Sequence, residues 1–282
     1  MSPSALRRIT LPAGEQIPVL GQGTWRMAEI RERRNEEIAA LRLGLDLGLT
    51  LVDTAEMYAD GGAERLVGEA ITGRRDEVFL VSKVLPSNAT PSRMILACEA
   101  SLRRLNTDRI DLYLLHWPGP TPLWQTLDGF RELVDRGWIR YWGVSNFDVL
   151  DLAALWDLPL GADVQTDQVL YNLARRSPEY SLLPWCQEHE LPVMAYSPVE
   201  RGDMVRHPAV RGVAERRGIT PAQVAIAWVL RQPLVCAIPK SGSREHVREN
   251  AAAAAITLTA ADLQELDLAF PPPRKPEPLQ TH

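Results

Sequence analysis

Short apolar segments alternate with longer segments of helical periodicity along most of the chain. Apolar runs typical of buried strands occur at 19–21, 50–53, 77–83, 110–115, 141–144, 163–168, 192–196 and 235–238. The segments that predict helices are 35–48, 63–72, 92–105, 123–136, 148–156, 179–189, 220–231, 244–254 and 260–269. About eight strands that alternate with about eight helices predict an α/β fold of the (β/α)8 TIM-barrel type.

The two ends of the chain depart from this alternation. At the start, "RRITL", a turn at Pro12–Gly14 and "QIPVLG" predict a β-hairpin. At the end, "FPPPRKPEP" predicts a short irregular tail, because proline lacks the N–H that regular structure uses. No linker-like break precedes this tail. The sequence therefore predicts a single barrel domain over 1–282, with 271–282 as a proline-rich tail.

A doubly wound dinucleotide-binding sheet is the rival fold. Its fingerprint needs three glycines in the pattern G-x-G-x-x-G after the first strand. The segment "LGQGTWR" supplies Gly21 and Gly23 but has Arg26 at the third position. The fingerprint is absent, which favours the barrel.

Composition narrows the class of protein. The net charge of −5, with scattered basic residues, gives no electrostatic footprint for nucleic acid. No apolar run reaches the ~18 residues of a membrane span, and "MSPSALRRIT" lacks the apolar core of a signal peptide. The odd number of cysteines, 3, suits a reducing compartment. We expect a cytoplasmic protein without a nucleic-acid or membrane partner. Because no long apolar surface stripe is evident in the sequence, we also expect a monomer.

Nearly every predicted strand ends in a polar or ionisable residue. Because functional residues of these barrels gather at the carboxyl ends of the strands, this coincidence indicates a site at one rim. Any one of them alone could cap a turn, lie on the surface or be a satisfied core residue. The strand-end residues are Asp53, Lys83, His116, Ser145, Asn146, Gln168, Tyr196, Ser197, Lys240 and Ser241.

Asp53, Lys83 and His116 of this set, with Tyr58 of the loop after the second strand, can together act as a general acid. A phenol has a pKa of about 10, and a cation beside it lowers that value. Lys83 can supply the cation for Tyr58, Asp53 can hold the lysine charged, and His116 can donate to a substrate carbonyl. Such a group suits hydride addition to an aldehyde or ketone, with the hydride supplied by a cofactor because no side chain carries it.

These residues lie in motifs that resemble the aldo-keto reductase family. The motifs "GTW" at 23–25, "DTAEMY" at 53–58, "VSK" at 81–83, "LYLLHWP" at 112–118, "GVSNF" at 143–147, "QVLYN" at 168–172 and "YSP" at 196–198 occur in the family's order. The resemblance is closest to bacterial members of the methylglyoxal-reductase type, through "DTAEMYADGGAE" and "CEASLRRLNTD". It covers almost the whole chain and implies a (β/α)8 reductase that uses a nicotinamide nucleotide.

The resemblance also implies a role for each matching residue. Tyr58 is implied as the proton donor, tuned by Lys83 and Asp53, while His116 orients the carbonyl of a small-molecule substrate. Tyr196 is implied to stack on the nicotinamide. The other implied cofactor contacts are Ser145, Asn146, Gln168, Ser197, Gly202, Lys240, Ser241, Arg244, His246, Glu249 and Asn250. The implied walls of the substrate pocket are Trp25, Met57, Trp117 and Phe147, each of which could instead be an ordinary core aromatic or apolar residue.

Three departures from the family pattern affect these expectations. His246 stands where many members have arginine, and histidine is a weaker partner for a 2′-phosphate. Lys240 and Ser241 remain to receive the 2′-phosphate, so we expect NADPH to be preferred, with NADH as a weaker alternative. The preference should be modest unless Arg244 or Arg248 reaches the phosphate in place of His246. The segment "VERGDMVRHPAV" after "YSP" is short, which predicts a reduced flap. The tail after Phe270 is also short, which predicts a more open pocket and a broad specificity.

Two other classes of function remain. A redox-sensing module of the same fold would bind cofactor with little turnover, and turnover of a simple aldehyde with NADPH would separate it from a reductase. A metal-dependent barrel hydrolase or lyase would need ligand spacing that the 5 histidines do not show, and "HEL" at 189–191 does not continue to H-E-x-x-H. We therefore expect no metal.

Overall fold

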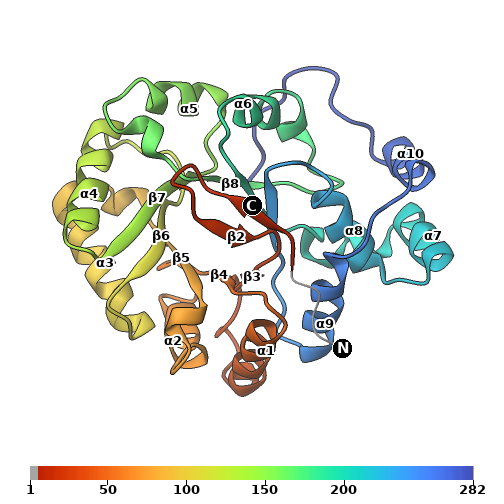
Figure 1. Ribbon diagram of the computed structural model, residues 1–282, viewed down its shortest axis with the longest axis horizontal. Coiled ribbons are helices and arrows are strands. Elements are labelled where there is room, and N and C mark those ends of the chain that lie inside the picture. The colour runs from red at the N-terminus through yellow and green to blue at the C-terminus, as the bar shows by residue number, and fades with distance from the viewer. Residues whose placement is uncertain (1–5, 282) are drawn as a thin grey trace.

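Parallel strands and helices alternate through the computed structural model, which describes residues 6–281 (Figure 1). The strands are β1 Arg8–Thr10, β2 Gln16–Pro18, β3 Gln22–Gly23, β4 Leu51–Asp53, β5 Phe79–Val84, β6 Ile110–Leu115, β7 Ile139–Ser145, β8 Asp167–Leu170, β9 Val193–Tyr196 and β10 Val235–Ile238. The α-helices are α1 Arg34–Asp46, α2 Gly62–Ala70, α3 Pro91–Leu105, α4 Leu123–Asp135, α5 Val149–Trp156, α6 Leu182–Glu188, α7 Pro208–Arg217, α8 Pro221–Val229, α9 Arg244–Ala253 and α10 Ala260–Ala269. Short 3-10 turns are η1 Arg31–Arg33, η2 Arg75–Glu77, η3 Pro86–Asn88, η4 Gly161–Asp163, η5 Ser177–Glu179, η6 Glu200–Gly202 and η7 Met204–Arg206.

Strands β3 to β10 form one parallel sheet of 8 strands in chain order. Its two edges meet through parallel bridges that join Leu20 to Ala237 and Gly23 to Lys240. Gly23 permits this closure, since a Cβ there would lie 2.6 Å from the carbonyl oxygen of Ile238. The sheet is thereby closed into a barrel, and the predicted fold class is confirmed.

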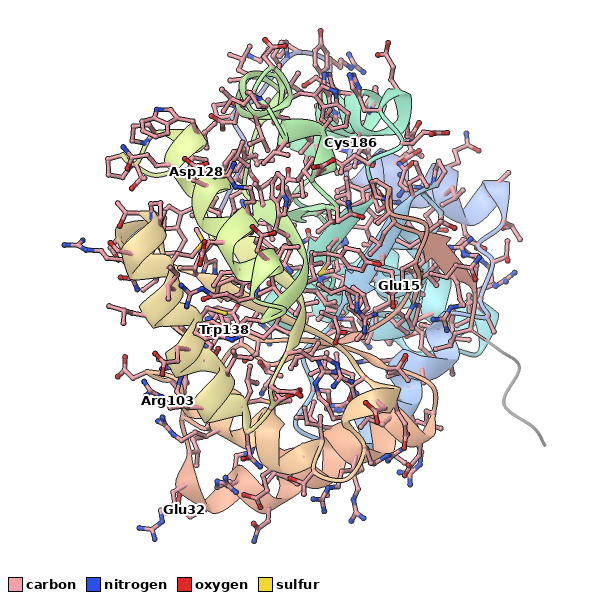
Figure 2. All side chains as sticks on the ribbon, turned by 60° about the vertical axis from the view of Figure 1, so that its left-hand side comes forward. Glu15, Glu32, Arg103, Asp128, Trp138 and Cys186 are labelled. Carbon is pink, nitrogen blue, oxygen red and sulfur yellow. The ribbon has the colours of Figure 1, made fainter. Side chains whose placement is uncertain are left out.

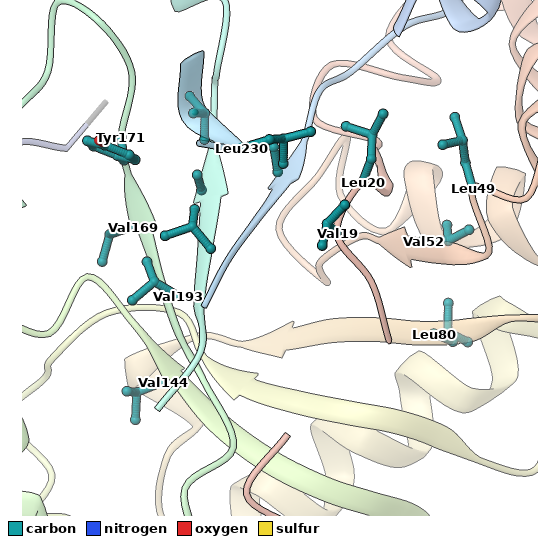
Figure 3. Packing of buried hydrophobic residues seen from close by; sticks show 14 of the residues in the cluster. Val19, Leu20, Leu49, Val52, Leu80, Val144, Val169, Tyr171, Val193 and Leu230 are labelled. Carbon is teal, nitrogen blue, oxygen red and sulfur yellow. The ribbon is translucent and has the colours of Figure 1, made fainter. Parts of the chain in front are cut away.

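Side chains of the barrel strands alternate between the two faces of the sheet, as strand geometry requires. Leu51, Val81 and Leu114 face the barrel interior and belong to a small apolar cluster there. Val52 and Leu80 face the helices and belong to the larger cluster between strands and helices (Figure 3). Two apolar layers, one inside the barrel and one around it, therefore hold the strand ends in fixed positions.

The predicted hairpin, β1 paired antiparallel with β2, covers one end of the barrel. Leu11 and Ile17 from the hairpin are buried in the interior cluster. At the hairpin's turn, the backbone N–H of Ala13 donates to Gln165 Oε1 at 2.9 Å, and Glu15 pairs with Arg140 at 2.8 Å. The hairpin thus fills the amino-terminal end of the barrel and leaves the opposite end for a site.

Helices surround the strands and carry charged side chains on their outer faces, Arg103 of α3 among them (Figure 2). Predicted and observed helix bounds agree closely where capping signals exist; Thr220, for example, forms a capping box with Gln223. Helix α7 is absent from the predicted elements, because the short segment 199–210 favours a reduced flap. Its signals are a proline at the first turn after His207, whose Nδ1 accepts from the N–H of Ala209, and Gly218 in the left-handed region at its end.

The predictions at the two termini fall partly outside the described residues. Residues 1–5 of the segment judged unlike a signal peptide, and residue 282 of the tail, lie there. Among the helices of residues 6–281, none combines the length and the apolar character needed to cross a bilayer.

Candidate active site

A cavity of about 800 Å³ opens at the carboxyl ends of the barrel strands. The alternation within strands explains why its polar residues face inward. Asp53 follows the inward Leu51 by two positions, and Lys83 follows the inward Val81 by two. His116, Tyr196 and Lys240 stand in the same relation to Leu114, Met194 and Ile238. A period of two therefore converts separate strand ends into one ring of polar side chains.

A buried ion pair lies at the base of this ring. Lys83 Nζ donates to both carboxylate oxygens of Asp53, at 2.7 and 2.8 Å, and to the carbonyl of Thr54 at 2.9 Å. The same ammonium lies 3.2 Å from the hydroxyl of Tyr58. Lys83 is 0% exposed and Asp53 2%. The structure thus brings together three of the four predicted catalytic residues through direct contacts.

The loop between β4 and α2 holds Tyr58 against this pair. Three consecutive residues, Ala59, Asp60 and Gly61, have φ between 48° and 74°, which turns the chain sharply back into α2. The backbone N–H of Tyr58 donates to the carbonyl of Ala55. Glu56 ties the loop down, since its Oε1 accepts from the N–H of Leu85 at 2.7 Å. Within "DTAEMY", the glutamate is therefore structural, whereas the aspartate and the tyrosine face the cavity.

His116 completes the predicted catalytic set. Its ring lies 5.8 Å from that of Tyr58, edge to face, and it lines the cavity. Burial, followed by the positive charge of Lys83, lowers the pKa of His116 to about 3. The imidazole is therefore neutral at neutral pH and carries one N–H. Its Nδ1 has no hydrogen-bond partner among the described residues.

The pKa of Tyr58 differs from the sequence-based expectation. Burial, with the negative charge of Asp53 second, raises the pKa of the phenol well above its usual value. Burial also lowers the pKa of Lys83, although Asp53 opposes this shift and favours the ammonium. The net shift in the phenol's pKa is therefore upward, opposite to the expected lowering, with burial as its main cause. The phenol keeps its proton at neutral pH, which is the state that an acid requires before transfer.

Amide and hydroxyl groups form a second cluster beside the catalytic set. Asn146 adopts a left-handed φ of 61°, a conformation that asparagine tolerates. Its Nδ2 donates to Ser145 Oγ at 3.0 Å and to the carbonyl of His116 at 3.1 Å, and its Oδ1 accepts from Tyr196 at 2.9 Å. Gln168 donates to Asp53 at 2.8 Å. The residues expected to bind the nicotinamide carboxamide and the tyrosine expected to stack on its ring are thus joined in one hydrogen-bond network.

The loop after β9 is braced by residues that the sequence analysis did not select. Ser197 and Gly202 line the cavity, with φ of 51° and 91°. Asn172 Nδ2 donates to the carbonyl of Ser197 at 2.9 Å and to the buried carboxylate of Glu200 at 2.7 Å. Arg175 pairs with Glu200 at 2.9 Å. The motif "QVLYN" ends at Asn172, so the motif itself was the sequence signal that could have identified this residue.

The short tail reaches this loop and the cavity. Arg175 Nη1 donates to Gln280 Oε1 at 3.2 Å, and Thr281 lines the cavity. Leu279 packs against the main apolar cluster. An irregular segment of proline-rich chain therefore spans the distance from α10 back to the barrel mouth and supplies one residue of the cavity wall. The more open pocket and the broad specificity expected from the short tail stay predictions.

The predicted phosphate-binding residues divide into two groups. Lys240 is half-buried, lines the cavity, and has a pKa lowered mainly by burial. Ser241 accepts from the N–H of Ser243, just before α9. The remaining predicted contacts, Arg244, His246, Glu249 and Asn250, lie along α9 and outside the wall of the cavity. Arg244 and His246 are exposed, whereas Asn250 is buried.

Three of the four residues predicted to wall the substrate pocket line the cavity. Trp25, Met57 and Trp117 line the cavity, and the guanidinium of Arg26 lies 4.8 Å from the Trp25 ring. Phe147 does not line the cavity. Its side chain points away from the barrel interior and is 0% exposed in the apolar cluster between strands and helices. The cavity-lining residues that sequence analysis missed are Gly23, Arg26, Pro118, Pro198, Val199, Ile238 and Thr281.

Within residues 6–281, no cluster of three or more histidine, cysteine or acidic side chains has the arrangement of a metal site.

Comparison with known proteins identifies the class. A model of the aldo/keto reductase family matches residues 19–269. Methylglyoxal reductase YeaE of Escherichia coli (strain K12) is 52% identical over 263 residues, 92% of this chain and 93% of that protein. An aldo/keto reductase from Klebsiella pneumoniae, solved with NADP and acetate, is 50% identical, covers 99% of this chain and 100% of its own, and has a TM-score of 0.96. The values are the same for a Klebsiella pneumoniae structure with NADPH.

A more distant relative agrees. The thermostable aldo-keto reductase Tm1743, solved with the inhibitor epalrestat, is 39% identical over 93% of this chain and 99% of its own, with a TM-score of 0.86. Fold and matches together define a barrel oxidoreductase. The chain belongs to the aldo/keto reductase family, and the resemblance inferred from its motifs is confirmed.

Proposed function

We propose that this protein uses NADPH to reduce aldehydes and ketones to alcohols, with Tyr58 as the proton donor. The observation that carries the proposal is the contact of Lys83 with both Asp53 and Tyr58 at the floor of the cavity. Small 1,2-dicarbonyl compounds such as methylglyoxal are the substrate class that we propose, since the chain is 52% identical to a methylglyoxal reductase.

The residues present fit a nicotinamide nucleotide. Amide and hydroxyl groups of Ser145, Asn146 and Gln168 match the hydrogen bonds of a carboxamide, and the Tyr196 ring offers a face for stacking. Lys240 offers a cation at the same cavity for a phosphate. NADPH, when bound, supplies hydride to the carbonyl carbon of the substrate.

The protein's own groups then act on the carbonyl oxygen. The neutral His116 donates its N–H to that oxygen and orients the substrate between Trp25 and Trp117. As negative charge develops there, Tyr58 transfers its phenolic proton to the oxygen, and Lys83 stabilises the phenolate that remains. The raised pKa of Tyr58, caused by burial, keeps this proton in place until the strongly basic alkoxide character appears.

We also propose that NADPH is preferred over NADH, through Lys240 and the polar start of α9. Ser243 occupies the N-cap position of α9 without a side-chain cap bond. Backbone N–H groups at such a helix start favour an anion. Because His246 and Arg244 are exposed on α9 outside the cavity wall, we expect a modest preference.

Replacement of Tyr58 tests the function. Tyr58→Phe keeps the ring and removes the proton, so kcat for methylglyoxal reduction should fall by ~10²–10⁴-fold. The Kd of NADPH, measured by fluorescence quenching, should change little. Tyr180→Phe is a matched control, because Tyr180 is exposed and lies outside the cavity wall. Retention of more than a tenth of wild-type kcat in Tyr58→Phe, with chemistry rate-limiting, would remove Tyr58 from this role.

A further inference from the structure

Gln168 makes a contact that cofactor binding alone does not require. Its Nε2 donates to Asp53 Oδ1 at 2.8 Å, across the barrel from β8 to β4. This oxygen also accepts from Lys83 Nζ at 2.7 Å. Gln168 is 1% exposed and Asp53 2%, so the bond is shielded from bulk water.

The chemistry of the two groups fixes the direction of the amide. An ionised carboxylate only accepts, so the nitrogen of the Gln168 amide must face Asp53. The same nitrogen lies 2.9 Å from Met194 Sδ, a weak acceptor. Both amide hydrogens are thus directed to protein groups, and Oε1 is the atom left to accept from a nicotinamide carboxamide.

We propose that Gln168 is a positioning residue for the proton donor, which acts through Asp53 and links the carboxamide seat to Tyr58. This inference rests on the proposed function and deepens it. Gln168 is connected to Tyr58 by a chain of three contacts, through Asp53 and Lys83, and each is 3.2 Å or shorter. A group that binds Oε1 therefore acts on one end of a chain whose other end is the acid.

The direction of the effect follows from charge. A hydrogen bond to an ionised group stabilises its negative charge and makes it a weaker attractor for a neighbouring cation. With the bond, Lys83 is shared between Asp53 and Tyr58. Without it, the charge of Asp53 holds Lys83 more strongly and opposes phenolate formation. The other titratable groups that face this chain are His116 after β6, Glu64 on α2 and Cys236 on β10.

Two substitutions of Gln168 and one control separate this role from cofactor binding. Gln168→Met keeps the length and removes both hydrogen-bonding groups. Gln168→Glu restores a donor only when it is protonated. Ser145→Ala is the control, because Ser145 belongs to the same proposed carboxamide seat. Its hydroxyl donates to the backbone carbonyl of Gln168 at 2.7 Å and not to the carboxylate of Asp53.

Three quantities are measured: the Kd of NADPH, the pH profile of alcohol oxidation at saturating cofactor, and the ¹³Cζ resonance of Tyr58 in cofactor-free protein. Tyr58→Phe assigns the resonance. In Gln168→Met we expect a kcat at least tenfold lower, an oxidation profile shifted upward by about one pH unit, and a displaced resonance. In Gln168→Glu, reduction should decline as pH rises through a new ionisation. Ser145→Ala should raise the Kd and leave profile and resonance unmoved.

The opposite pattern overturns the inference. If Gln168→Met and Ser145→Ala both raise the Kd, and neither moves the profile or the resonance, Gln168 serves only to seat the cofactor. Should Gln168→Met fail to fold, the absence of a new ionisation in Gln168→Glu would equally overturn the positioning role. Failure of the proposed function is a different result: wild-type protein would lack NADPH-dependent reduction, or Tyr58→Phe would match it.

Discussion

Replacement of Lys83 by methionine separates the structural and the chemical roles of the buried ion pair. Methionine has a similar length and no charge, so the substitution removes the ammonium and little volume. In the native protein this ammonium contacts Asp53 at 2.7 and 2.8 Å, Thr54 at 2.9 Å and Tyr58 at 3.2 Å. Lys83→Met therefore leaves the carboxylate of Asp53 buried without its cation, and leaves Tyr58 without a charge to stabilise phenolate.

The expected loss of stability follows from burial. Removal of one partner of a buried ion pair costs about 3–5 kcal/mol, since the other charge remains unpaired. Gln168 still donates to Asp53 at 2.8 Å, which favours the lower end, near ~3 kcal/mol. For a chain of this size such a loss lowers Tm by roughly 6–12 °C. The double variant Lys83→Met/Asp53→Asn removes the second charge as well and should recover most of this loss.

Activity should not recover with stability. The double variant still lacks a cation beside Tyr58, so kcat should stay at least ~10²-fold below wild type. The assay combines urea or thermal unfolding of wild type, single and double variants with carbonyl reduction at saturating NADPH. A double variant that regains both stability and activity would show that Lys83 only neutralises Asp53. A single variant as stable as wild type would refute the estimate made from burial.

Three further predictions concern the rim of the barrel. Burial lowers the pKa of His116 to about 3 in the folded protein, against about 6.5 in the unfolded chain. The free energy of unfolding should therefore be highest above pH ~6.5 and fall as pH drops from there toward ~3, because only the unfolded chain takes up the proton. His116→Gln should flatten this part of a pH–stability curve measured by urea unfolding. Lys240→Ala should weaken NADPH by about tenfold and NADH far less, whereas His246→Arg should strengthen NADPH alone; equal effects on both cofactors, measured as Kd at fixed salt and pH, would contradict a 2′-phosphate contact. Arg175→Met removes the contacts to Glu200 and Gln280, so NADPH release in stopped-flow fluorescence should accelerate and KM for small carbonyls should change; unchanged values of both would mean that the tail and the loop after β9 act independently.

Much of the fold is present in local patterns of the sequence. Alternating apolar and helical segments predict the barrel, because strand and helix periods depend on neighbouring residues only. The hairpin and the capping box at Thr220 are predictable for the same reason. Helix α7 carries capping signals of the same kind, at His207 and Gly218. This helix is nevertheless missing from the sequence-based prediction, because the short segment 199–210 is interpreted there as a reduced flap.

The sequence by itself determined which chemistry gathers at the barrel mouth, since the period of two places Asp53, Lys83 and His116 on the inner face once strands are assumed. Tertiary structure alone decided how these groups act on one another. Burial reverses the expected shift in the pKa of Tyr58, and closure of the barrel brings Gln168 of β8 to Asp53 of β4. The tail reaches the cavity at Thr281 through Arg175. Each depends on contacts between residues far apart in the chain, which local sequence patterns do not encode.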